Sequence, residues 1–143
     1  MLTNDIAELS RELQHLYFLN IHKKLKKLGL YPGQQIIINL VADNPGISQS
    51  KLVSLTNRKA STITKTLFRL ENNGYIERHL KDNNIKNNYV YLTTKGMKAY
   101  NEFKSIINNY NELIMKVLTN EEQEQLLSII IKLKGEMINE RDI

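Results

Sequence analysis

Cationic and hydroxyl side chains recur at helical spacing in the middle of the chain. Arg58, Thr62, Lys65 and Arg69 follow one another at intervals of four, three and four residues. In a helix that turns ~100° per residue, these four side chains project within roughly 60° of one another. Arginine and lysine bind phosphates and the acceptor edge of guanine, and hydroxyl groups bind bases or phosphates. The chemistry that this spacing offers is recognition of a polyanion.

The opposite side of the same segment is apolar. Ala60, Ile63, Leu67 and Leu70 project away from the cations, so a helix over 60–73 is expected to anchor in a core and present the cations outward. For this helix taken alone, an ordinary solvated face is the alternative. Residues 51–69 contain five cations and no anion, however, whereas a solvated helix usually mixes both signs.

The positive charge of the whole chain is concentrated in the same region. The 143 residues carry a net charge of +5. Residues 48–98 hold 10 basic and 3 acidic side chains, residues 1–47 hold 5 and 4, and residues 99–143 hold 5 and 8. An acidic partner such as nucleic acid is therefore expected to bind the middle third.

Few residues suggest catalysis, a cofactor or a metal. Cysteine is absent, which excludes disulfides and thiolate chemistry. No nucleophile motif, glycine-rich phosphate loop or paired carboxylates stand out, so we predict that the protein is not an enzyme and needs no cofactor. His15 and His22 lie seven residues apart, but no carboxylate accompanies them in a tight cluster, and no metal site is predicted.

No stretch approaches the ~18 apolar residues that a membrane helix needs. The first twenty residues carry Asp5, Glu8, Arg11 and Glu12, unlike a signal peptide. We therefore expect a cytoplasmic protein without a membrane partner.

Helical periods and turn residues divide the chain into six helices and one hairpin. The predicted helices run from Leu2 to the stop at Gly29, from Pro32 to the turn at Asp43–Gly46, from Ser48 to Thr56, from Ala60 to Asn73 before Gly74, from Thr94 to Leu118, and from the capping box Thr119-x-x-Glu122 onward. The predicted strands span 75–80 and 89–93, with a polar loop between them.

Two of the inner helices are expected to pack in the core. The helix from Pro32 is apolar nearly all round and is expected to be central and buried; its apolar residues are Ile36, Ile37, Ile38, Leu40 and Val41. The short helix from Ser48 is expected to turn Leu52, Val53 and Leu55 inward.

Both ends of the chain are apolar rather than basic. A heptad-like stripe on the first helix is typical of a helix that packs on a partner helix; it consists of Leu2, Ile6, Leu9, Leu13 and Leu16. The last helix has eight large hydrophobic residues in the thirteen positions 126–138, more than one isolated terminal helix should expose.

The order of elements is that of a winged helix-turn-helix core between two helical flanks. We predict a mainly α fold with a small β-hairpin wing. Residues 1–143 are expected to form one domain, in which 32–96 are the DNA-binding lobe and 1–29 and 97–143 are flanking helices.

Four motifs resemble the winged-helix core of MarR-family bacterial transcription regulators. They are Gly46-Ile47-Ser48-Gln49-Ser50-Lys51-Leu52, Ser61-Thr62-Ile63-Thr64, Leu70-Glu71-Asn72-Asn73-Gly74-Tyr75-Ile76-Glu77-Arg78 and Leu92-Thr93-Thr94-Lys95-Gly96. The resemblance implies a homodimer in which residues 1–29 and 97–143 are dimerisation helices and the first and last helices of the two subunits intertwine. The chain departs from the family's Asp-x-Arg wing motif, because Asn84-Ile85-Lys86 keeps a cation without the planar guanidinium.

We predict a transcription regulator that acts as a repressor, whose homodimer binds a pseudo-palindromic operator in double-stranded DNA. The candidate DNA-binding residues are Ser48, Lys51, Arg58, Lys59, Ser61, Thr62, Thr64, Lys65, Arg69, Arg78, Lys81 and Lys86. The resemblance also implies a small aromatic or phenolic effector between the dimerisation helices and the DNA-binding lobe. Its candidate pocket residues are Tyr17, His22, Tyr31 and Tyr100. The alternative is a winged-helix interaction module that binds a protein partner or RNA.

Overall fold

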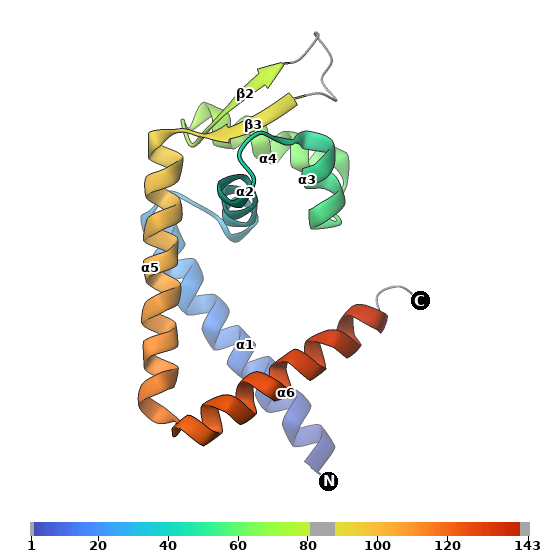
Figure 1. Cartoon of the computed structure of the whole chain (residues 1–143), viewed down its shortest axis with the longest axis vertical. Helices are drawn as coiled ribbons and strands as arrows, with labels where there is room; N and C mark the ends of the chain where they lie inside the picture. Colours follow the sequence, from blue (N-terminus) through green and yellow to red (C-terminus); the bar gives the residue numbers. More distant parts are fainter. Residues whose placement is uncertain (1, 81–87, 141–143) are drawn as a thin grey trace. The chain divides into compact units, whose positions relative to one another are not determined.

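Six helices and three strands follow one another in the described part of the chain, residues 2–80 and 88–140 of the computed structural model (Figure 1). The elements are α1 Leu2–Lys27, α2 Pro32–Asp43, β1 Ile47–Ser48, α3 Gln49–Thr56, α4 Ala60–Asn72, β2 Ile76–Leu80, β3 Asn88–Leu92, α5 Thr94–Val117 and α6 Asn120–Asn139. This mainly helical architecture confirms the predicted fold class. The chain divides into an N-terminal unit, Met1–Lys104, and a C-terminal unit, Ser105–Ile143.

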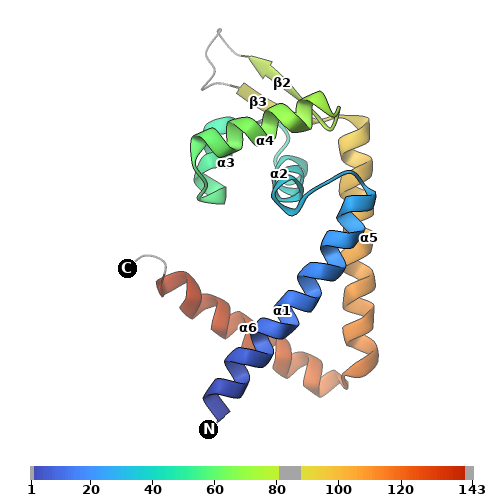
Figure 2. The same ribbon diagram turned by 180° about the vertical axis from the view of Figure 1, so that it is seen from behind.

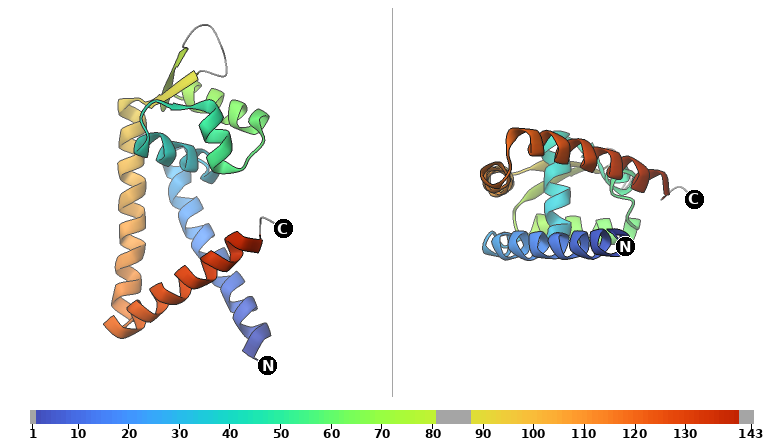
Figure 3. Two further views of the ribbon diagram at one scale, coloured as in Figure 1. Left: turned by 45° about the vertical axis from the view of Figure 1, so that its right-hand side comes forward. Right: turned by 90° about the horizontal axis from the view of Figure 1, so that it is seen from below.

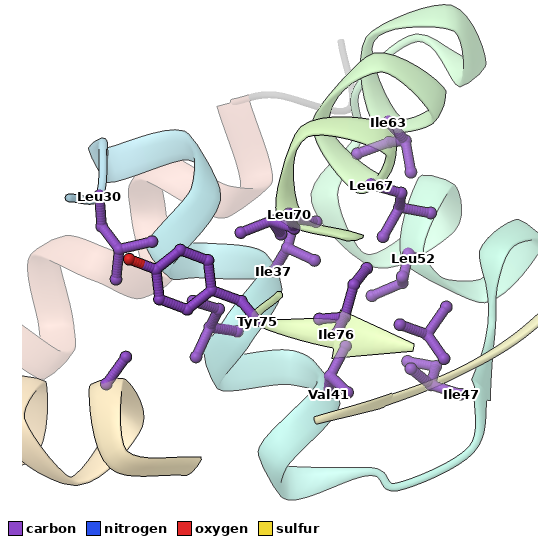
Figure 4. Packing of buried hydrophobic residues seen from close by; sticks show 13 residues of the cluster. Leu30, Ile37, Val41, Ile47, Leu52, Ile63, Leu67, Leu70, Tyr75 and Ile76 are labelled. Carbon is purple, nitrogen blue, oxygen red and sulfur yellow. The ribbon is translucent and has the colours of Figure 1, made fainter. Parts of the chain in front are cut away.

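The core of the N-terminal unit brings α2, α3, α4 and the sheet together. Thirteen buried side chains form one cluster (Figure 4); they are Leu30, Ile37, Ile38, Val41, Ile47, Leu52, Ile63, Leu67, Leu70, Tyr75, Ile76, Val90 and Ala99. Helices α2 and α4 each contribute residues three or four positions apart, as an amphipathic helix on a core requires. Burial of these apolar side chains holds the helix-turn-helix in place.

Two apolar residues that were predicted to face the core are exposed. Ile36 is 43% exposed, because α2 packs through Ile37, Ile38 and Val41 and leaves one side to solvent. Leu55 is 49% exposed, because the last turn of α3 extends beyond Leu52, its fully buried residue.

The sheet has one strand more than the predicted hairpin. Its order is β1-β3-β2, and both pairings are antiparallel. Ile47 of β1 pairs with Val90, and Ile76 of β2 pairs with Leu92. β1 has only two residues, too few to show the alternation that marks a strand in a sequence. Figure 3 shows β2 and β3 beside α4, which β2 contacts.

Hydrogen bonds join the end of α4 to the start of α5. Gly74 has a φ of +77° and ends α4, where the Tyr75 N–H donates to Leu70 O at 2.9 Å. The Thr93 hydroxyl donates to Gly74 O at 2.5 Å and accepts from the Gly96 N–H at 3.1 Å. A Cβ on Gly96 would lie 2.0 Å from the carbonyl oxygen of Tyr75, so only glycine permits this approach.

From residue 5 onward, where burial is described, helix α1 has its buried residues toward its C-terminal end. Ile21 and Leu25 are buried, whereas the stripe residues Ile6, Leu9, Leu13 and Leu16 are 57–63% exposed. The Tyr75 hydroxyl donates to Leu28 O at 2.6 Å and so ties the residue after α1 to the start of β2.

The C-terminal unit holds the end of α5 and α6. The predicted capping box is present: the Thr119 hydroxyl accepts from the Glu122 N–H at 3.3 Å, and the Thr119 N–H donates to Glu122 Oε2 at 2.8 Å. None of the described residues of α6 is buried, and its eight large hydrophobic side chains are 37–62% exposed. Across the described residues, no helix combines the length and apolarity needed to cross a membrane.

Candidate nucleic-acid interface

Helix α4 has the two faces that the sequence predicts. Ile63, Leu67 and Leu70 are fully buried, while Ser61, Thr62, Lys65 and Arg69 are exposed. Within residues 2–80 and 88–140, none of these four exposed side chains forms a hydrogen bond or an ion pair. The outward face of α4 therefore carries two exposed cations that have no partner among the described residues. Ala60, predicted on the apolar side, is exposed in the first turn of the helix.

Arg58 does not extend this face, contrary to the helical spacing. The N-cap of α4 is Lys59, with extended backbone angles, and α3 ends at Asn57 in the left-handed region at φ 51°. The regular angular spacing of side chains on α4 therefore does not include Arg58. Arg58 is half-buried, and its guanidinium lies over Gly33 in the first turn of α2, with one nitrogen 2.9 Å from the position that a Cβ there would take.

Thr64 and Ser48 use their hydroxyl groups within the helix-turn-helix. The Thr64 hydroxyl accepts from Gln49 Nε2 at 2.8 Å and donates to Ala60 O at 2.9 Å. It thus joins α3 to α4, which lie side by side in Figure 2. Ser48 caps α3, its hydroxyl accepting from the Lys51 N–H at 3.1 Å. Both residues position the two helices.

Arg78 is paired rather than free. On β2, its Nε donates to Glu71 Oε2 of α4 at 2.9 Å, and its Nη2 donates to the same oxygen. The Arg78 side chain is only 19% exposed. This ion pair ties the wing strand to α4, and it neutralises one of the cations that the sequence predicts for the interface.

Of the remaining predicted cations, Lys51 on α3 and Lys59 before α4 are exposed. Lys81 and Lys86 lie outside the described residues, as does the Asn84-Ile85-Lys86 departure from the family wing.

Phe68 is a residue of this surface that the sequence reasoning missed. It is 57% exposed on α4 and lines a surface depression with Thr64, Lys65, Arg69 and Arg78. The prediction of DNA-binding residues from the sequence included only cationic and hydroxyl side chains. The spacing of Phe68 already indicated its position, because it follows Lys65 by three residues and Ser61 by seven, which places the three side chains on one helical face.

The predicted effector residues are not all brought together. The rings of His22 and Tyr31 lie 6.4 Å apart, and Phe18 stacks on His22 at 5.6 Å. Nδ1 of His22 is buried and has no hydrogen-bond partner within the described part of the chain. We call Phe18, His22 and Tyr31 the ring cluster. Tyr17 precedes His22 by five residues, so their side chains leave α1 ~140° apart.

Tyr100 lies at the other end of α2. Its hydroxyl donates to Asp43 Oδ1 at 3.0 Å, and Lys104 Nζ lies 4.6 Å from the centre of its ring. Asp43 ends the helix that Tyr31 begins, and twelve residues of helix span ~18 Å. The structure therefore places Tyr100 apart from the ring cluster.

Comparison with known proteins gives one consistent family. The profile described as MarR family matches residues 30–87, the stretch from the start of α2 to the wing. A protein from Clostridium acetobutylicum assigned to the MarR family of transcriptional regulators is 31% identical, with a TM-score of 0.72, and the match covers 92% of this chain and 98% of that one.

Two solved structures from Staphylococcus aureus share the fold at lower identity. MarR in complex with salicylate and kanamycin is 16% identical with a TM-score of 0.87, over 98% of this chain and 95% of that one. MepR in complex with DNA is 22% identical with a TM-score of 0.73, over 92% of this chain and 95% of that one. The matched profile, the near-complete coverage of a relative and the outward face of α4 lead to one conclusion: the chain belongs to the MarR family, whose members are DNA-binding transcriptional regulators and not enzymes.

Proposed function

We propose that the protein is a homodimeric repressor that binds a pseudo-palindromic operator with α4 of each subunit in the major groove. The observation that carries this proposal is the outward face of α4. Lys65 and Arg69 are exposed there, no anion shares the stretch from 51 to 69, and neither cation has a partner within the described residues. A duplex supplies the phosphates and acceptor groups that such a face needs.

The residues divide by the contact that each can make. The proposed base or groove contacts are Ser61, Thr62, Lys65 and Arg69, and the proposed phosphate contacts are Lys51, Lys59, Lys81 and Lys86. Arg58 is left out of the groove contacts, because its guanidinium lies over Gly33 of α2. Ser48, Thr64 and Arg78 are assigned to holding α3, α4 and β2 in position, because their polar atoms are engaged inside the fold. Such a protein acts where chromosomal DNA is, in the cytoplasm of a bacterial cell.

Two apolar surfaces support a dimer. The stripe Ile6, Leu9, Leu13 and Leu16 on α1 and the large side chains of α6 are exposed in the single chain. Exposed apolar surface of this extent marks an interaction site. A second copy of the chain would cover it and place two α4 helices on one duplex, with half-sites ~34–36 Å apart.

The proposed effector is a small aromatic or phenolic molecule that binds near the ring cluster and weakens operator binding. His22 Nδ1, which has no partner among the described residues, offers a hydrogen bond, and Phe18 and Tyr31 offer ring faces. Salicylate in the complex with the Staphylococcus aureus MarR belongs to this chemical class. Salicylate is therefore the first compound to titrate against the protein–operator complex.

Selection of duplexes from a random library with the purified protein would provide the operator. Gel-shift titration would then compare the wild type with Lys65→Ala/Arg69→Ala. We expect a loss of affinity of at least about tenfold, because each bidentate base contact is worth ~1–3 kcal/mol. The free energy of unfolding in urea should be unchanged, because both side chains are exposed and form no ion pair with any described residue.

A charge-matched control separates recognition from general attraction. Lys23→Ala/Lys26→Ala removes two exposed lysines from α1 and the same net charge, and should leave operator affinity close to that of the wild type. Equal losses in both double variants, or none in either, would contradict the role of α4. Light scattering tests the dimer, since the chain mass is 16.7 kDa and twice that mass is expected at micromolar concentration.

A further inference from the structure

Phe68 is an aromatic side chain presented to solvent by the DNA-facing side of α4. It is 57% exposed, while Ile63, Leu67 and Leu70 of the same helix are fully buried. The outward direction of α4 is the direction opposite these three residues. Phe68 projects ~50° to one side of the outward direction, and Arg69 projects ~50° to the other side. A ligand that contacts Arg69 across this face therefore also contacts Phe68.

The surroundings of Phe68 are cationic. The depression that it lines has a volume of about 450 Å³, and its other lining residues are Thr64, Lys65, Arg69 and Arg78. Arg78 is held by Glu71, whereas Lys65 and Arg69 have no partner among the described residues. Lys65 and Arg69, which border the apolar ring, are thus available within the described part of the chain to meet phosphates or guanine.

A single exposed apolar side chain is ordinary on a protein surface, so exposure alone assigns nothing to Phe68. Its position is what matters, because it lies among the side chains proposed to enter the major groove. On the major-groove edges of base pairs, the C5-methyl group of thymine is the apolar feature, and phenylalanine is among the side chains that contact it.

We propose that Phe68 determines specificity by contacting the C5-methyl group of a thymine in each operator half-site. The inference rests on the proposed function, because it requires α4 in the major groove. Phe68 supplies an apolar contact that a cation or a hydroxyl cannot supply. Lys65 and Arg69 hold the helix at the depth where that contact forms.

Uracil tests the contact, because deoxyuridine differs from thymidine only by the missing methyl group. Each thymine of the operator is replaced in turn, and affinity is measured for the wild type, Phe68→Leu and Phe68→Ala. We expect one position in each half-site at which the wild type loses affinity about threefold to fourfold, the value for one buried methyl group. Phe68→Leu should keep part of this sensitivity, and Phe68→Ala should lose it.

The control variant is Met97→Ala, which truncates an exposed apolar side chain on α5 and should keep the full sensitivity of the wild type. The inference is overturned if uracil changes affinity at no position, or if the wild type and Phe68→Ala lose affinity equally. A uniform loss in Phe68→Ala, independent of uracil, would instead indicate contact with deoxyribose and also overturns it. In each of these outcomes the wild type still binds the operator, so the proposed function stands. Failure to bind any duplex removes both.

Discussion

Replacing Gly96 by alanine should destabilise the N-terminal unit. A Cβ at this position would lie 2.0 Å from the carbonyl oxygen of Tyr75 and 3.0 Å from its carbonyl carbon. The oxygen would have to move by more than about 1 Å to reach ordinary contact distance. It belongs to the backbone at the junction of α4 and β2, and it accepts the Thr93 N–H at 3.1 Å, so it cannot move alone.

The expected net loss is about 2 kcal/mol in the free energy of unfolding. Overpacking costs ~1–3 kcal/mol, and weakening the Thr93 hydrogen bond adds ~1 kcal/mol. The higher helix propensity of alanine offsets ~1 kcal/mol of this loss in the free energy of unfolding. For a chain of this size, the loss corresponds to a melting temperature lower by roughly 6–8 °C.

Gly135→Ala is the matched control, because Gly135 also lies inside a helix but a Cβ there would meet nothing within 4 Å. It should leave stability unchanged or raise it by up to ~1 kcal/mol. Both variants are unfolded in urea and by heat at one protein concentration, since the stability of a dimer depends on concentration. If Gly96→Ala is as stable as Gly135→Ala, the close approach of α5 to Tyr75 is refuted.

Three further predictions concern hydrogen bonds of the N-terminal unit. Burial and, to a smaller extent, the charge of Glu102 raise the pKa of Tyr75 above its ordinary value. The neutral hydroxyl therefore contributes its full stabilisation below pH ~10, and this stabilisation is lost as the pH rises through the raised pKa. Tyr75→Phe should therefore have a free energy of unfolding in urea ~1 kcal/mol below that of the wild type at pH 8, and this difference should narrow above pH 10. A difference that stays constant with pH would contradict the prediction. Glu71→Ala should lower the free energy of unfolding in urea by about 1 kcal/mol, because Arg78 loses its ion-pair partner. An unchanged urea midpoint would mean that the ion pair contributes nothing to stability. Thr64→Val should lower the free energy of unfolding in urea by ~1–3 kcal/mol, because the buried Gln49 amide loses its hydrogen-bond acceptor. Adding Gln49→Leu to Thr64→Val should recover most of this loss. A double variant as unstable as Thr64→Val would exclude the unpaired Gln49 amide as the cause.

Much of the candidate interface could be read from local patterns. The two faces of α4 follow from side chains within four residues of one another, and the structure has Ile63, Leu67 and Leu70 inside and Lys65 and Arg69 outside. The capping box at Thr119 and the end of α4 at Gly74 are local in the same sense. These features depend on backbone geometry that neighbouring residues determine by themselves.

The contacts that engage or redirect side chains could not be read in this way. The hydroxyl of Thr64 bonds a residue 15 positions away in the sequence, and Arg78 pairs with a glutamate on another element seven positions before it. Arg58 lies against Gly33 because the turn after α3 changes the direction of the chain. Each contact depends on how elements pack, and sequence periodicity carries no information about that packing.

The sequence by itself therefore determined which helices form, which side of α4 carries charge, and the family to which those motifs point. Only the tertiary structure decided which of those polar groups are engaged inside the fold, that Ile47–Ser48 adds a third strand, and that Phe68 lies exposed among cations. The reason is physical: amphipathicity and capping arise within one or two turns of helix, whereas exposure and pairing depend on surfaces that meet only after the chain has packed.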